Sequence, residues 1–146
     1  MLYGWLLFLH VLSVGAFLFA HGVTGGASFL LRGPVTSSTR TLLQYSQRAG
    51  VVADPALILI IITGIWMTFA GQWSSRAWPW VALGLLIVMM AFMVLASRPY
   101  YQARDASKGT DEDVASRMAS TNPVLVALVG VIGLVLLFGL MVFKPF

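Results

Sequence analysis

The sequence predicts an all-α, polytopic membrane protein built as one domain, a bundle of four transmembrane helices over residues 1–146. Hydrophobic residues make up 59% of the chain and charged residues only 10%. With a mean hydropathy of +0.89, the chain carries more apolar surface than a soluble domain of this length buries. Spanning helices need about 20 apolar residues, and four stretches without Asp, Glu, Lys or Arg provide them: residues 3–31, 55–72, 78–97 and 123–143.

The first stretch begins almost at the N-terminus. The opening residues MLYGW carry no basic side chain, unlike the positive n-region of a signal peptide. No small-residue cleavage site is followed by a soluble domain. We therefore expect residues 3–31 to remain as a spanning helix.

Local signals mark where the later helices begin. Asp54-Pro55 and Asn122-Pro123 each place a capping side chain before a proline suited to a first helical turn, which predicts the second and fourth spans. The segments between the spans, residues 32–54 and 98–122, are then expected to be cytoplasmic loops. Within the second loop, Thr110 before three acidic residues predicts a short surface helix over residues 111–119.

The distribution of basic residues predicts the orientation. Seven Lys and Arg residues fall in the two long loops, and only Arg76 and Lys144 lie on the opposite side. The positive-inside rule then places the loops in the cytoplasm and both termini outside, in a bacterial inner membrane. Tryptophans agree, because four of the five would form an outer aromatic belt: Trp5, Trp73, Trp78 and Trp80.

Composition also excludes several classes of site. The chain has no cysteine, which excludes disulfides, zinc–thiolate sites, iron–sulfur clusters and covalently attached c-type haem. The basic residues lie at helix ends instead of forming a patch. Nucleic acid is therefore not an expected partner, whereas the lipid bilayer is.

The only two histidines, His10 and His21, lie inside the first apolar stretch. Their spacing of eleven residues puts them on one helix face, about 16 Å apart along the axis. They cannot both ligate one metal or one haem iron unless the helix breaks at its glycines. A haem would use one histidine with a methionine, one histidine alone, or one histidine from each of two chains.

Arg32 is the expected inner end of the first helix, and the depth of each histidine follows from its distance to Arg32. His21 is eleven residues away, about 16 Å, hence near mid-membrane, and His10 would lie at the outer interface. If the first and third helices face each other, His21 would meet Met89 or Met90. His10 would then lie near Arg76, a cation suited to a haem propionate.

Structural explanations compete with each of these assignments. His10 would then be a hydrated side chain at the level of the aromatic belt. His21 would form a hydrogen bond to a backbone carbonyl, although ionisable groups at membrane depth usually have a function. Met89, Met90 and Met93 would offer thioethers to Cu(I) or would simply fill space. Gly22 and Gly26 would admit a partner helix or would merely be tolerated.

The chain resembles a group of small four-helix bacterial membrane proteins related to the membrane domain of copper resistance protein D and, more distantly, to HemJ-type protoporphyrinogen oxidases. The shared features run along the whole chain: Leu9-His10-Val11, Arg32, the tryptophan-rich entry to the third helix, Asn122-Pro123 and Lys144-Pro145-Phe146. This resemblance implies a b-type haem bound through His10. The HemJ-type enzymes carry a lysine early in the third helix, whereas residues 78–86 here have none.

Three functional hypotheses follow for this chain, and whether it is an enzyme stays open. The first is a haem b protein with a redox or haem-related role, using His10 or His21. The second is a non-catalytic accessory subunit of a respiratory or photosynthetic complex, or a homo-oligomer, packed through the glycine face. The third is copper handling by the two histidines and the methionine cluster.

Overall fold

The computed structural model describes residues 1–31, 34–106 and 109–145. Predictions that involve Arg32, Lys108 and Phe146 lie outside these described residues. Within them the chain forms six helices: α1 (Leu2–Leu30), α2 (Ser37–Ala70), α3 (Trp78–Ala96), α4 (Arg98–Asp105), α5 (Asp111–Ala119) and α6 (Pro123–Phe143). Four of them, α1, α2, α3 and α6, are long and apolar enough to cross a membrane. The predicted all-α fold with four spanning helices is confirmed.

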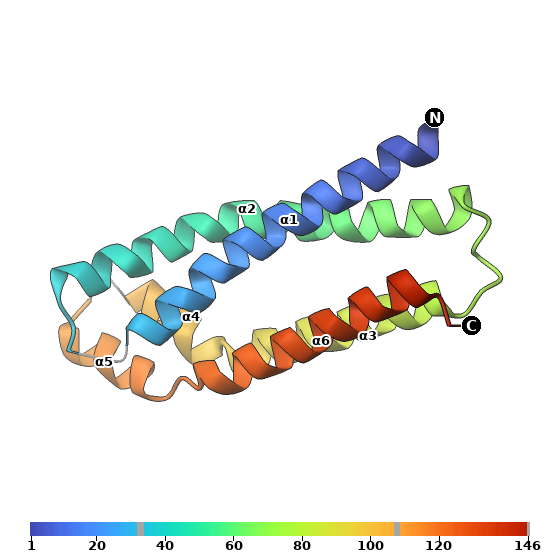
Figure 1. Ribbon diagram of the computed structural model, residues 1–146. Coiled ribbons are helices and arrows are strands. Elements are labelled where there is room, and N and C mark those ends of the chain that lie inside the picture. Colours follow the sequence, from blue (N-terminus) through green and yellow to red (C-terminus); the bar gives the residue numbers. More distant parts are fainter. Residues whose placement is uncertain (32–33, 107–108, 146) are drawn as a thin grey trace.

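The four spanning helices form two antiparallel pairs. α1 packs on α2 and α3 packs on α6, while contacts between the two pairs are sparse. Both chain termini and the connection from α2 to α3 lie at one end, here called the terminal end, and α4 and α5 lie at the other, here called the loop end (Figure 1). The expectation that the first and third helices face each other is wrong, because α2 is the main partner of α1.

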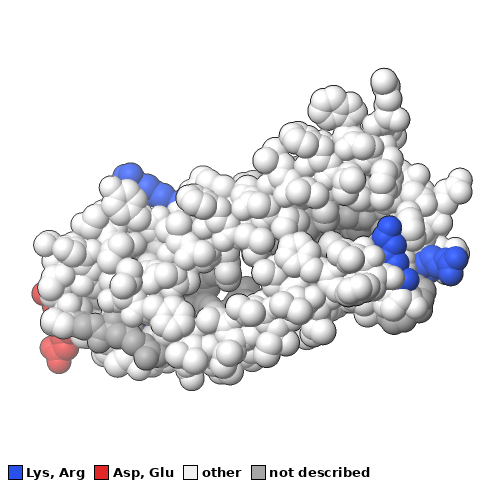
Figure 2. Space-filling model, viewed as in Figure 1, with Lys and Arg blue, Asp and Glu red and all other residues white. Residues whose placement is uncertain are grey.

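Charged side chains lie toward the two ends of the molecule in the view of Figure 2, and an uncharged band separates them. Large apolar side chains of the spanning helices are exposed, among them Phe19 at 77%, Val88 at 67% and Ile132 at 58%. Such exposure would be costly in water and is expected where lipid is the solvent. The surface therefore agrees with four helices in a bilayer.

α2 begins eighteen residues before the predicted start at Pro55. Its N-terminus is a capping box, in which Thr36 Oγ1 accepts from the Thr39 amide and Thr39 Oγ1 accepts from the Thr36 amide. Asp54 is thus not an N-cap, and Pro55 sits inside a continuous helix. The prediction failed because a proline inside a helix is tolerated where packing holds the preceding turns, and here Leu43 and Ser46 are fully buried.

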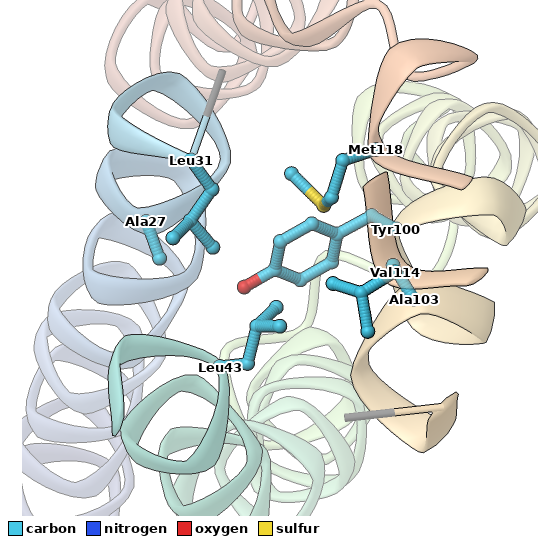
Figure 3. Close-up of a cluster of buried hydrophobic side chains, with 7 residues drawn as sticks. All are labelled: Ala27, Leu31, Leu43, Tyr100, Ala103, Val114 and Met118. Atoms are coloured by element: carbon cyan, nitrogen blue, oxygen red, sulfur yellow. The ribbon is translucent and has the colours of Figure 1, made fainter. Parts of the chain in front are cut away.

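A hydrophobic core closes the loop end, where α4 and α5 pack against the ends of α1 and α2. The Tyr100 ring points from α4 toward α1 and α2 and is surrounded by apolar side chains (Figure 3): Ala27, Leu31, Leu43, Ala103, Val114 and Met118. The segment 98–122, predicted as a loop with one helix, therefore holds two. α5 begins after Thr110, whose Oγ1 accepts from the Asp113 amide, as predicted. Asn122 likewise caps α6 by accepting from the Leu125 amide.

At the terminal end, the C-terminus of α6 meets the connection between α2 and α3. Lys144, which adopts a left-handed conformation at the C-cap of α6, places Nζ 4.0 Å from the Trp73 ring centre and 5.8 Å from that of Trp78. The two indoles pack edge to face, with centroids 5.4 Å apart. This cation–π cluster ties the last turn of α6 to the start of α3.

Candidate functional site: the two histidines of α1

His10 is buried between α1 and α2, with only 8% of its surface exposed. Gly64 makes this burial possible, because a Cβ at that position would lie 3.3 Å from His10 Cε1. The imidazole therefore lies against the bare backbone of α2. The hydrogen-bond partner of the imidazole is Thr63, the residue before Gly64 in α2.

A hydrogen bond joins His10 Nδ1 to Thr63 Oγ1 at 2.9 Å. The Thr63 hydroxyl donates its single hydrogen to the Leu59 carbonyl, so toward His10 it acts as the acceptor. His10 Nδ1 must then carry the proton. In the neutral imidazole this leaves a lone pair on Nε2, the nitrogen that a metal would bind.

The depth of His10 differs from the prediction. Thr63 lies seven residues before the end of α2 at Ala70, so this contact is about 10 Å inside the terminal end of that helix. Arg76 is exposed in the connection that follows α2. Among the described residues, no contact joins Arg76 to His10, which instead faces α2.

His21 lies near the loop end instead of at mid-membrane. It stacks on Phe17, with ring centroids 5.4 Å apart and planes 19° apart. It also lines a cavity together with Ser97, just after α3, and Asn122, just before α6. Ser97 comes seven residues after Met90 along the chain, so the level of His21 is displaced by about 10 Å from the predicted one.

The reason for this displacement is the length of α1. Ala27 and Leu31, at its end, are buried in the loop-end core beside Tyr100. The last turn of α1 therefore extends into the loop-end core, so depth measured back from Arg32 places both histidines too far toward the terminal end of the bundle.

The methionines of α3 pack against α6. Met89 Sδ occupies the place that a Cβ on Gly133 would take, and Met93 Cε would lie 3.0 Å from a Cβ on Gly130. Met90 is half-buried on the same helix. The structure therefore does not bring Met89 to His21, and two of the three thioethers fill notches at glycines of α6.

A single metal centre that uses both histidines is not formed within one chain. α1 is one unbroken helix from Leu2 to Leu30, so His10 and His21 stay about 16 Å apart along it. In the described part of the chain, no three His, Cys, Asp or Glu side chains gather in a way that could hold a metal ion. Each histidine has its own surroundings: His10 meets a buried hydroxyl, and His21 a cavity whose lining includes several hydroxyl groups.

Sequence reasoning missed Thr63 and Gly64. The available signal was the pair itself, a hydroxyl and a glycine together in the apolar run ILIIITGIW. Small and hydroxyl-bearing residues allow close approach and hydrogen bonding between membrane helices. The run would have identified the face of α2 that receives α1.

Comparison with known proteins agrees with this architecture. No curated protein and no solved structure matches the chain. The sequence profile of one family, described as "Predicted integral membrane protein (DUF2269)", matches residues 5–145. That match covers all four spanning helices and nearly the whole chain, so the protein belongs to this family of integral membrane proteins.

Proposed function

We propose that this integral membrane protein binds a b-type haem through His10. The observation that supports the proposal is the hydrogen bond from His10 Nδ1 to Thr63 Oγ1. Histidines that ligate a metal almost always donate their other ring N–H to an oxygen, which fixes the tautomer and the ring orientation. Thr63 supplies that oxygen, and it cannot donate in return because it donates to Leu59.

The residues of the site would supply one ligand to the iron. His10 Nε2 would bind the iron, and the bound haem would supply one-electron chemistry. Thr63 would hold the imidazole in place. Arg76, the exposed cation at the terminal end, is the candidate partner for a propionate. Met89 and Met93 pack at Gly133 and Gly130, so neither is proposed as a second ligand.

The sparse packing between the two helix pairs also favours a bound group. Contacts between the pairs α1–α2 and α3–α6 are few compared with those within each pair, and Figure 1 shows the N-terminal half of α1 diverging from α3 and α6. His10 lies in the pair α1–α2, on the terminal-end side of the loop-end core. The resemblance to the membrane domain of copper resistance protein D and to HemJ-type oxidases, and a location in a bacterial inner membrane, stay predictions that accompany this proposal.

The visible spectrum of the purified protein tests the proposal. The chain is expressed in haem-replete cells, purified in mild detergent and scanned for a Soret band. We expect a band that is lost in His10→Ala and kept in His21→Ala, the matched substitution on the same helix. A colourless wild-type protein, or a band that survives His10→Ala, would contradict haem binding through His10.

A second candidate is the role of an accessory subunit, and the glycines of α1 favour it. A Cβ added at Gly15, Gly22 or Gly26 would meet no atom within 4 Å, so this face of α1 is left open by its own chain. Small residues let another membrane helix approach closely. Replacing Gly22 and Gly26 by Leu would then release a co-purifying membrane subunit, whereas Gly139→Leu on α6, also in open space, would retain it.

Copper handling gains no support from the arrangement. It would require histidine nitrogens and thioether sulfurs to converge on one ion. His10 is packed on α2 and Met89 on α6, and these helices belong to different pairs. We therefore do not propose it.

A further inference from the structure

A cavity of about 40 Å³ lies near the loop end, between α1 and the segments where α3 ends and α6 begins. Figure 2 shows this face hollowed between α1 and the first turns of α6. A site of this volume holds about three water molecules, provided that polar partners surround them. Its lining supplies such partners, and His21 is among them.

Three of the hydroxyl groups that line the cavity are arranged as acceptors. Thr24 donates to the Ala20 carbonyl, Ser28 to the Gly25 carbonyl and Thr121 to the Met118 carbonyl. Each hydroxyl hydrogen is therefore used within its own segment, and each oxygen keeps lone pairs free. Three such oxygens on one cavity favour an occupant that donates hydrogen bonds, which water does.

His21 has a ring face on Phe17 and no hydrogen-bond partner in the described part of the chain. A polar ring nitrogen at this depth needs a partner, because leaving it unsatisfied costs several kcal/mol. The cavity is the place where His21 meets other polar groups. Asn122, which also lines it, is exposed at the protein surface, so water has a short path in.

We propose that this cavity is a water-filled proton-exchange site in which His21 takes up and releases protons at the loop end. A hydronium ion in the cavity transfers its proton to the unprotonated ring nitrogen: one O–H bond breaks, one N–H bond forms, and a water molecule is left behind. The other titratable groups that line the site are Tyr100 and Tyr101; Arg104 lies outside it, over the Tyr101 ring. Among the described lining residues there is no Asp, Glu, Lys or Arg.

This function is independent of haem binding, since it uses a different histidine and a different end of the membrane span. The test is NMR of the full-length protein in lipid nanodiscs with ring-labelled histidine. The chain has only two histidines, so the substitution His21→Gln assigns both sets of signals. We expect the His21 signals to follow pH and to receive magnetisation from water, while those of His10, buried against Thr63, do neither.

Two variants of α1 sharpen the test. Gly25 lines the cavity, and a Cβ there would meet no atom within 4 Å, so Gly25→Leu fills the cavity without a backbone clash. Gly4→Leu is its matched control, since Gly4 also belongs to α1 and lies in open space but does not line the cavity. We expect transfer from water to His21 to fall at least tenfold in Gly25→Leu and to stay unchanged in Gly4→Leu.

Unchanged His10 signals would show that Gly25→Leu is folded. If that variant fails to fold, Thr24→Val, which removes one acceptor oxygen at nearly constant volume, takes its place with the same expected direction. Wild-type His21 signals that ignore pH and receive no magnetisation from water would overturn the proposal. So would equal transfer to His21 in Gly25→Leu and in wild type.

Discussion

His10 and Thr63 form a directed hydrogen bond across the α1–α2 interface, with Nδ1 of the imidazole 2.9 Å from the hydroxyl oxygen that accepts from it. Thr63→Val keeps the shape of the side chain but removes the acceptor. Losing such a bond between membrane helices costs about 1 kcal/mol. We expect that decrease in the free energy of unfolding, measured by SDS titration in mixed micelles.

Thr63→Ser is the matched control, because it keeps the hydroxyl and should retain most of the stability. If haem binds, Thr63→Val should also shift or broaden its Soret band, since the tautomer is no longer fixed, whereas Thr63→Ser should not. Equal stability and equal spectra for the two variants would contradict a role for the hydroxyl.

Gly64 provides the space for the His10 ring. A Cβ there would lie 3.3 Å from Cε1, so Gly64→Ala forces the ring to move by a few tenths of an ångström and strains its bond to Thr63. Against Gly15→Ala, which meets no atom within 4 Å, we expect Gly64→Ala to be less stable by about 1 kcal/mol. The same SDS titration measures both, and a Gly64→Ala variant as stable as Gly15→Ala would contradict the packing.

Met89 and Gly133 interlock α3 with α6. The Met89 thioether occupies the space of the missing Cβ, so Gly133→Ala should destabilise the protein by about 1–2 kcal/mol. The loss should be smaller in a Met89→Ala background, because the thioether that blocks the new Cβ is then absent. A double-mutant cycle would measure this difference as a coupling energy. Gly139→Ala, in open space, is the neutral control, and simple additivity of the two changes would rule out the interlock.

Burial raises the pKa of the Tyr100 phenol, while the nearby Ser46 hydroxyl and the Arg104 charge oppose the rise. The folded protein thus holds this proton more tightly than the unfolded chain, whose phenol titrates near pH 10. Below that pH the phenol is protonated in both the folded and the unfolded protein, so its titration does not change the free energy of unfolding. Above it the unfolded chain ionises first, so the free energy of unfolding falls as the pH rises toward the folded pKa.

Tyr100→Phe should remove this alkaline loss. Its effect at neutral pH should be close to zero or stabilising, because the buried hydroxyl has no well-formed hydrogen bond to any described residue. Unfolding curves of both proteins between pH 7 and pH 11 would show the difference opening above about pH 10. Parallel curves across that range would contradict the burial of the phenol.

The sequence alone was sufficient for the spanning segments and for two helix starts. A long apolar run indicates that lipid surrounds the helix. The caps at Thr110 and Asn122 accept hydrogen bonds from residues only three positions away. Such local signals do not depend on the rest of the fold. The early start of α2 depends on the rest of the fold. In sequence, residues 37–54 resemble a charged loop, and their helix is stabilised where Leu43 packs in the core around Tyr100.

Which helices pair, and at which level of the bundle each histidine lies, could be learned only from the structure. The sequence of an apolar helix says little about which neighbouring helix it contacts, because its side chains pack against lipid as well as against protein. The prediction that His21 meets Met89 or Met90 assumes that the first and third helices face each other, whereas Met89 lies at Gly133 of α6. The burial of Ala27 and Leu31 in the loop-end core shifted both histidines from their expected levels.

α2 runs as one continuous helix of 34 residues, a rod about 51 Å long. It carries Leu43 into the loop-end core and Thr63 to the ring of His10. A turn of this rod about its axis would withdraw both side chains from their partners at once. The surroundings of His10 are therefore coupled to the packing of the loop-end core through a single helix.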